Sequence, residues 1–397
     1  MSIFLFCKQI VDMLYQFKFL DYGMVLFALV LICYKFWKDK IYKDIKGFLC
    51  PEDGIVIVLM AVYALSFLRY PAGYGTFFKI ESCFLIYFVG RLYGKEILQH
   101  GKMLAYAGYL IVYVNFIYRF YQFGFKFILT GPEVTLLNVG GLYFYKTDLA
   151  IGIIIAALFI YMFSENKWLK WITIVPVCGY MVFYSGARMG QIVMVVEYVL
   201  ILLCELEKRN VFHLKIKWKL VRGIFIALCA VVVVLFVALQ VFPFEEIAAN
   251  LNIETGRGSF IESLMHSRHI VWSDILKYFS EQPLLTRFLG IDLETEYMHN
   301  AMEIEAHSAY IKQIYATGYL GCGLLAALIG RIWYGLCREK ERNVRYIVLI
   351  LWAMLLGAGL TVESLESTQM SWFPMLFTGI LFVKEKNGIQ TVQEQSE

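Results

Sequence analysis

The amino-acid sequence predicts an all-α polytopic membrane protein, and three observations lead to that class. Of its 397 residues, 60% are hydrophobic and only 17% are charged. The mean hydropathy is +0.63, which is too apolar for a soluble domain of this length. The apolar residues also come in segments of about 20, the length of helix that crosses the hydrocarbon core of a bilayer.

Each predicted span is an apolar segment bounded by polar or charged residues. We place about eleven, near residues 20–37, 54–70, 76–93, 103–120, 148–163, 168–184, 190–205, 220–242, 310–333, 344–362 and 370–383. The segment 2–19 is also apolar but carries Lys8, Asp12 and Lys18. It is therefore predicted as an interfacial helix or as a twelfth span.

The distribution of positive charge predicts the orientation of these spans. Of the 36 Lys and Arg residues, 23 fall in alternate connections, at 35–46, 91–102, 167–170, 208–222, 331–345 and 384–386. Positive residues in short loops resist translocation, so we expect these connections and the carboxyl terminus in the cytoplasm. The long polar segment between the eighth and ninth spans then lies outside.

This orientation divides the chain into four parts. Residues 1–242 hold the first eight spans, and 243–309 form an extracytoplasmic catalytic loop. The last three spans occupy 310–384, and 385–397 form a cytoplasmic tail. The parts are predicted to make a single membrane domain.

Charge and cysteine usage narrow the function. The net charge of +4 is spread over the predicted cytoplasmic connections, so the bilayer is an expected partner and nucleic acid is not. None of the nine cysteines lies in the long polar segment, which favours packing roles over disulfides. His266 and His269 have a spacing that suits zinc, but no HExxH run or Cys pair accompanies them. We expect no metal and no cofactor.

Two arginine motifs are candidates for binding an anion. Arg188 ends the turn Ser185-Gly186-Ala187-Arg188 between two predicted spans, where a guanidinium needs an anion or a water-filled cavity. The alternative is that it extends to the membrane interface. Arg268 stands with Trp272 at the head of an amphipathic segment, where its planar donors can grip a phosphate. The alternative for this motif is an ordinary solvated turn.

Two further motifs are candidates for acid–base chemistry. His307 opens His307-Ser308-Ala309-Tyr310, ahead of Gly318 and Gly321, and a neutral imidazole there can accept a proton from a sugar hydroxyl. A lone histidine is more often structural. Glu363 and Glu366 stand three residues apart on one helical face, where they can act as a base, bind an ion or mark the end of a span.

Taken in order, these motifs resemble those of the O-antigen polymerase and O-antigen ligase superfamily of membrane glycosyltransferases. Its members show a small-polar-Arg turn between two spans, an outer loop with Arg-x-x-x-Trp, and a His motif followed by Gly-x-x-Gly. The matching residues are Ser185 to Arg188, Arg268 with Trp272, Pro283 with Gly290, and His307 to Tyr310 with Gly318 and Gly321. Asp292 and Ser308 depart from the family pattern, which often has glycine and asparagine there.

The resemblance implies a polysaccharide polymerase of the O-antigen or capsule type. Such an enzyme transfers a growing glycan from undecaprenyl pyrophosphate to a sugar hydroxyl of the next lipid-linked repeat unit, without a metal. It would work on the outer face of a bacterial cytoplasmic membrane, with flippase and chain-length regulator proteins as partners. The absence of a Gly-rich phosphate loop or Rossmann pattern agrees with a lipid-linked donor.

The resemblance also implies roles for individual residues. Arg188 and Arg268 would stabilise the departing pyrophosphate, and His307 would accept the proton of the attacking hydroxyl. The remaining predicted substrate-binding residues are Lys146, Ser185, Trp272, Arg287, Tyr310, Glu363 and Glu366. Lys146 lies in the segment 141–148, which also looks like a family segment and adds positive charge.

Two alternatives stay open. Within the superfamily, a ligase passes a finished glycan to lipid A core or to protein. From another class, a lipid-linked oligosaccharide flippase or other transporter is also polytopic, although such proteins tend to show internal repeats and polar groups at mid-membrane. This chain instead concentrates its reactive residues at one predicted outer surface.

Overall fold

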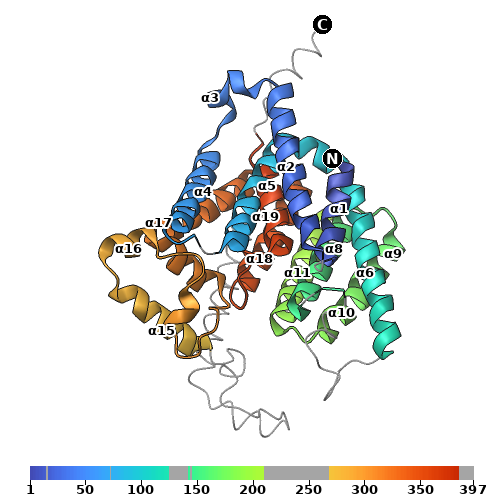
Figure 1. The fold of residues 1–397 in the computed structure, drawn as a ribbon. Helices are drawn as coiled ribbons and strands as arrows, with labels where there is room; N and C mark the ends of the chain where they lie inside the picture. Colours follow the sequence, from blue (N-terminus) through green and yellow to red (C-terminus); the bar gives the residue numbers. More distant parts are fainter. Residues whose placement is uncertain (15–16, 72, 125–141, 144, 210–267, 384–397) are drawn as a thin grey trace.

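The computed structural model describes residues 1–14, 17–71, 73–124, 142–143, 145–209 and 268–383. Over these residues the regular structure is helical throughout, without a strand (Figure 1). The predicted span 220–242, the first part of the predicted outer loop and the predicted tail lie outside the described residues.

Ten of the eleven predicted spans lie in the described part of the chain, and each is helical. The helices are α1 (Ser2–Met13), α2 (Lys18–Lys38), η1 (Ile41–Lys43), α3 (Ile45–Phe48), α4 (Pro51–Arg69), α5 (Tyr74–Gln99), α6 (Gly101–Phe123), α8 (Lys146–Phe163), α9 (Lys167–Ile172), η3 (Thr173–Cys178), α10 (Gly179–Tyr184), α11 (Arg188–Lys208), α15 (Arg268–Glu281), α16 (Leu284–Leu289), η4 (Glu296–His299), α17 (Ala309–Arg338), α18 (Arg342–Ala358) and α19 (Thr368–Leu381).

Six described helices are long and apolar enough to cross a membrane: α2, α4, α6, α8, α11 and α17. The others depart from a simple span in identifiable ways. Helix α5 carries five charged residues, and α18 and α19 have only 17 and 14 residues. The predicted span 168–184 is assembled from α9, the π-helical η3 and α10, with Pro176 inside the π segment. The count of eleven spans stays a prediction.

The amino-terminal helix α1 is too short to be a twelfth span. Its 12 residues reach about 18 Å at 1.5 Å per residue. Phe4 and Leu5 are fully buried, and Lys8 is buried beside Asp12 with its ammonium 4.4 Å from the Trp372 ring centroid. Helix α1 therefore packs inside the helical bundle.

Small residues bring the central helices into close contact. A Cβ atom at Gly90 of α5 would overlap the backbone of α19 at Leu376, and one at Gly379 would overlap the backbone of α5 at Tyr87. Glycine at such crossings lets membrane helices pack backbone to backbone. Helix α8 is buried along its length from Leu149 to Tyr161, which explains its unbroken apolar sequence.

Ion pairs join the basic connections at one end of the molecule. Lys35 Nζ lies 2.8 Å from Glu96 Oε1, and Lys102 Nζ lies 2.7 Å from Glu165 Oε1. Arg345 pairs with Glu207 at 2.5 Å. Arg91 connects the carbonyl groups of Phe48 in α3 and Phe382 after α19. Helix α3 lies at one end of the molecule and α15 at the other (Figure 1).

Candidate functional site

The first turn of α17 is fastened to the loop between α18 and α19. The Ala309 amide donates hydrogen bonds to the Gly359 and Val362 carbonyl groups, at 2.9 and 3.2 Å. The Ser308 hydroxyl donates to the same Gly359 oxygen at 3.3 Å. These bonds bring the His307 motif beside the loop that carries Glu363 and Glu366, two predicted site segments that are far apart in the sequence.

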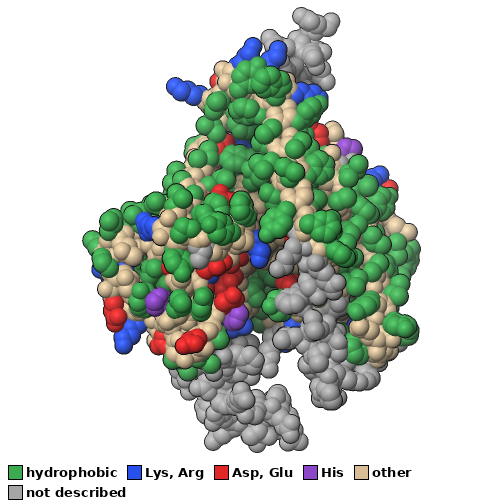
Figure 2. Space-filling view, viewed as in Figure 1, with side chains coloured by type: hydrophobic (Ala, Val, Ile, Leu, Met, Phe, Trp, Pro, Cys, Tyr) green, Lys and Arg blue, Asp and Glu red, His purple; other side chains and the backbone are tan. Residues whose placement is uncertain are grey.

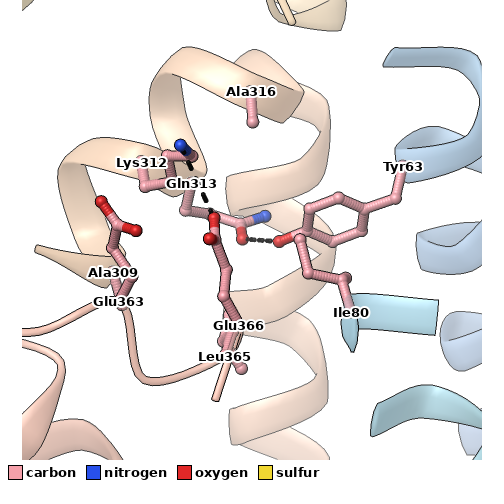
Figure 3. Close-up of a pocket in the computed structure, with 9 residues that line it drawn as sticks. All are labelled: Tyr63, Ile80, Ala309, Lys312, Gln313, Ala316, Glu363, Leu365 and Glu366. Atoms are coloured by element: carbon pink, nitrogen blue, oxygen red, sulfur yellow. Dashed lines mark hydrogen bonds and ion pairs between the residues drawn. The ribbon is translucent and has the colours of Figure 1, made fainter. Parts of the chain in front are cut away.

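Four ionisable side chains gather there, and we call Glu296, Lys312, Glu363 and Glu366 the Lys312 cluster. Lys312 Nζ donates to Glu296 Oε1 at 2.6 Å and lies 3.7 Å from Glu366 Oε1. Figure 3 shows Glu363 and Glu366 extending from their loop toward the first turns of α17. Glu296 is fully buried and Lys312 is 6% exposed, so the charges of the cluster are poorly hydrated.

The cluster holds more carboxyl groups than its cation can balance. One oxygen of each carboxyl, Glu296 Oε2, Glu363 Oε1 and Glu366 Oε1, has no hydrogen-bond partner among the described residues. A narrow cavity beside them, about 10 Å³, has room for about one water molecule. It is also lined by Tyr63, which donates to the side chain of Gln313 (Figure 3).

Burial controls the protonation of these carboxyl groups. It raises the pKa of Glu366 well above its ordinary value, with Lys312 opposing and the neighbouring Glu363 adding to the rise. Burial likewise raises the pKa of Glu363 and of Glu296, again with Lys312 opposing. Three carboxylates facing one ammonium cannot all ionise cheaply. The cluster therefore retains a proton at pH values where an exposed glutamate has lost it.

His307 lies directly beside this cluster in a strained backbone conformation. Its φ of 47° is in the left-handed region, which residues other than glycine rarely adopt unless the surroundings impose it. The Glu363 carboxyl group lies against the His307 backbone, whose amide lowers the pKa of that carboxyl. The imidazole is 46% exposed, with Nδ1 3.9 Å from Glu305 Oε2. His307 thus presents its ring to the surface while its backbone is fixed.

Arg268 acts electrostatically on His307. Burial and the Arg268 guanidinium both lower the pKa of His307, so the imidazole is neutral at neutral pH. Arg268 is the first residue of α15, and burial lowers its own pKa as well. The Arg268 guanidinium is therefore near enough to His307 to act on its charge, and the predicted catalytic roles of the two residues stay predictions.

Helix α15 is held in place by an apolar contact and one indole hydrogen bond. Val271 and Ile275 pack with Ala306 and Tyr315 in a small buried cluster. Trp272 Nε1 donates to the Ala306 carbonyl oxygen at 2.7 Å. The indole N–H of Trp272 thus fastens α15 to the residue before His307, and its predicted contact with a sugar stays a prediction.

Two of the glycines in the motifs meet each other. Gly290 and Gly318 both have positive φ, 87° and 62°, and Gly318 marks a kink inside α17. A Cβ atom at Gly318 would overlap the Arg287 carbonyl oxygen and the Gly290 amide nitrogen. One at Gly290 would overlap the Ala316 carbonyl group. Glycine is required at both positions by conformation and by space.

The remaining predicted residues differ in where they lie. The Tyr310 hydroxyl donates to the Leu356 carbonyl at 2.7 Å, and the Ser185 hydroxyl donates to the Val182 carbonyl at 2.6 Å, so both polar groups bond locally. Arg287 lies on α16, and no ion pair or hydrogen bond among the described residues joins it to the Lys312 cluster. Lys146 is the first residue of α8 and is partly buried.

Part of the predicted site falls outside the described residues. Arg188 is the first residue of α11, but its side chain is not described, nor is that of His269. His266 lies in the undescribed segment 210–267. The convergence of Arg188 with His307 and Arg268 therefore stays a prediction.

Lys312, Glu296 and Arg119 are among the buried charged residues that the sequence motifs did not single out. Lys312 and Glu296 form the shortest ion pair of the cluster, and Arg119 of α6 is 2% exposed. The Arg119 guanidinium carbon lies 3.1 Å from the ring centroid of Tyr184, next to the Ser185 turn. A charged residue within an otherwise apolar helix was the available signal for Lys312 and Arg119. Glu296 was hidden among many acidic neighbours.

The start of α8 faces the same region. Tyr145 is within electrostatic reach of Glu305, and Asp148 is within reach of Lys79 on α5. Figure 2 shows acidic side chains gathered at a hollow near the centre of one face, within a largely hydrophobic surface. Among the described residues, no three His, Cys, Asp or Glu side chains are placed to hold a metal ion.

Comparison with other proteins adds no family to these observations. No protein-family model matches the chain, and no curated protein sequence matches it. The fold and site define a helical chain with several apolar helices fit to cross a membrane and a buried acid–base cluster at the mouth of one of them. The proposed function therefore rests on the residues of this cluster and on the apolar helices.

Proposed function

We propose that the chain is a membrane glycosyltransferase that polymerises a surface polysaccharide of the O-antigen or capsule type. Its donor is a glycan on undecaprenyl pyrophosphate, and its acceptor is a sugar hydroxyl of the next lipid-linked repeat unit. The observation that carries the proposal is the meeting of Arg268, His307 and the Lys312 cluster at the first turn of the apolar helix α17. The order of the sequence motifs supports the same class.

The chemistry assigns one role to each charged group. The acceptor oxygen attacks the anomeric carbon, its proton passes to the neutral His307 imidazole, and the bond from that carbon to the pyrophosphate oxygen breaks. The lipid pyrophosphate leaves with both electrons of that bond. Arg268, and Arg188 by the motif, stabilise the negative charge that develops on it. The lowered pKa of His307 keeps the base deprotonated at neutral pH.

The Lys312 cluster holds the base in position. Glu363 lies against the His307 backbone, and Lys312 pairs with Glu296 and Glu366 and acts electrostatically on Glu363. A base held at a fixed angle to its substrate removes an orientational cost from the reaction. Glu366, with a raised pKa, adds a proton donor or acceptor within the same cluster.

The proposed topology has eleven spans and a cytoplasmic carboxyl terminus, in a bacterial cytoplasmic membrane. Ion pairs join the basic connections at one end of the molecule. The positive residues gathered there support the assignment of that end to the cytoplasm. Arg268 and His307 then face the extracytoplasmic side, where lipid-linked repeat units are used. Flippase and chain-length regulator proteins are the expected partners.

Extension of a defined lipid-linked oligosaccharide by the purified chain tests the proposal. Wild type should lengthen the glycan, and Arg268→Ala and His307→Ala should each slow extension by about a hundred- to thousandfold. Lys277→Ala on α15 and His100→Ala after α5 are matched controls, because both residues are exposed and no hydrogen bond or ion pair among the described residues joins either to the cluster. Unimpaired extension by the two site variants would overturn the assignment.

The same assay separates the alternatives. A ligase gives product only when lipid A core or a protein acceptor is added, whereas a polymerase needs lipid-linked units alone. A flippase gives no longer glycan in any mixture and instead moves the lipid-linked unit across vesicle membranes. That last outcome would exclude a glycosyltransferase.

A further inference from the structure

A second hollow, which shares no lining residue with the cavity at the Lys312 cluster, lies between the π-helical η3 and α11. It has a volume of about 340 Å³ and an almost wholly apolar lining. Its walls are formed by Trp171, Ile174, Val175, Tyr198, Ile201 and Leu202, and its end by Glu205, Leu206 and Arg209. Val175 is 53% and Leu202 is 57% exposed, so the groove opens sideways on the surface of the helical bundle.

The π segment keeps this groove open. Pro176 cannot donate a backbone hydrogen bond, and the π-helical turn releases carbonyl groups from their usual partners. The Tyr198 hydroxyl of α11 donates to the Ile174 carbonyl at 2.5 Å, which satisfies one of them. The Ile174 carbonyl beside the groove therefore has a polar partner within the protein, and the groove wall stays apolar.

Basic side chains lie beside the end of the groove that Glu205 and Arg209 line. Lys170, Lys208 and Arg209 gather around a single carboxylate, Glu205, with Lys208 Nζ 3.1 Å and Arg209 Nε 3.8 Å from it. Lys170 lies within electrostatic reach of both Lys208 and Glu205. Three cations and one carboxylate leave two positive charges beside the apolar groove. Trp168, at 83% exposed, extends outward at the same end, as residues at a membrane interface do.

We propose that this groove binds an anionic glycerophospholipid, with an acyl chain along η3 and α11 and its phosphate among Lys170, Lys208 and Arg209. The apolar length of the groove suits the acyl chain of such a lipid, and the basic residues at its end suit the phosphate. Basic pockets between membrane helices are typical binding sites for anionic headgroups. The site is independent of the proposed glycosyl transfer. It anchors the broken span α9–η3–α10 against α11 at the basic end of the molecule.

Native mass spectrometry of the purified full chain with added phosphatidylglycerol or phosphatidylcholine tests whether the basic residues select an anionic headgroup. Wild type should retain phosphatidylglycerol in preference. Lys170→Gln combined with Arg209→Gln should weaken that binding about tenfold or more, as expected for two lost headgroup contacts. Lys102→Gln, at an exposed lysine that pairs with the exposed Glu165, is the matched control. Equal retention of both lipids by wild type would overturn the proposal.

Two further variants test the groove itself. Val175→Trp should fill it and lower the binding of both lipids, with no loss of helical content. A photoreactive phenylalanine derivative in place of Leu202 should form an adduct with phospholipid in membranes. An adduct to residues 210–267 of the same chain would show that the protein covers its own groove, and would overturn the proposal.

Discussion

Two buried ionic groups in this molecule differ in how well their positive and negative charges balance. In the first, Asp53 of α4 accepts hydrogen bonds from Arg91 Nε at 2.9 Å, from the Tyr87 hydroxyl at 2.7 Å and from the Cys50 amide at 2.8 Å. One carboxylate faces one guanidinium, and both oxygens of Asp53 are satisfied. In the second, the Lys312 cluster, three carboxyl groups face one ammonium and three oxygens lack a partner among the described residues.

The difference indicates different roles. A balanced, fully bonded pair such as Asp53–Arg91 fixes α4 against α5 and leaves nothing for a ligand to bind. The Lys312 cluster leaves buried oxygens unbonded and raises the pKa of its acids, features that gather at functional sites. We therefore assign structure to the first group and chemistry to the second.

The largest expected effect on stability comes from breaking the balanced pair. Arg91→Met leaves the buried Asp53 without its cation and should destabilise the fold by about 3–5 kcal/mol. Thermal unfolding in lipid nanodiscs measures the loss, and Asp53→Leu combined with Arg91→Met should recover much of it. Unfolding of Arg91→Met at the wild-type temperature would show that the pair is not structural.

A smaller loss of stability should follow from replacing the glycine at the kink of α17. Gly318→Ala places a methyl group against the backbone of Arg287 and Gly290 and forces a positive φ on alanine. We expect a cost of about 1–3 kcal/mol in unfolding free energy. Gly323→Ala, five residues further along the same helix, meets no neighbour and should be neutral or stabilising. Equal effects of the two substitutions would contradict the glycine contact.

The smallest effect on stability should come from Glu366→Gln, which should stabilise the fold in a way that depends on pH. The pKa of Glu366 is raised in the folded chain, so its favourable contribution is complete below the ordinary carboxyl pKa and is lost as the pH rises through the folded value. Glu366→Gln removes that loss and should raise Tm by about 2–4 °C at neutral pH. At about pH 4 the two proteins should unfold alike. A lower Tm for Glu366→Gln at neutral pH would contradict the raised pKa.

The sequence predicted the helices and singled out Arg268 and His307 as candidate site residues. Ten apolar segments are helical, and the Arg268 guanidinium is near enough to the His307 imidazole to lower its pKa. These features follow from local composition and from short motifs, which single-sequence reasoning can read.

What the sequence could not predict is long-range pairing. Lys312 stands out as a charge in an apolar helix, but its partners do not. The hydrogen bond from Ala309 to Gly359 brings the start of α17 beside the loop of Glu363 and Glu366. Trp272 and Tyr310 are predicted substrate-binding residues, and nothing in the sequence indicates that their polar groups donate to the backbone carbonyls of Ala306 and Leu356. Hydrogen-bond partners of this kind are chosen by the tertiary structure.

The pH dependence of glycan extension, measured for wild type and Arg268→Gln, tests the central claim most directly. The rate should rise from acid pH as His307 loses its proton, with a midpoint below the ordinary histidine pKa of about 6.5. Removing the Arg268 cation should lower the rate and move that midpoint upward. An acid limb that is absent, or that stays in place in Arg268→Gln, would contradict a reacting site built from this arginine and this histidine.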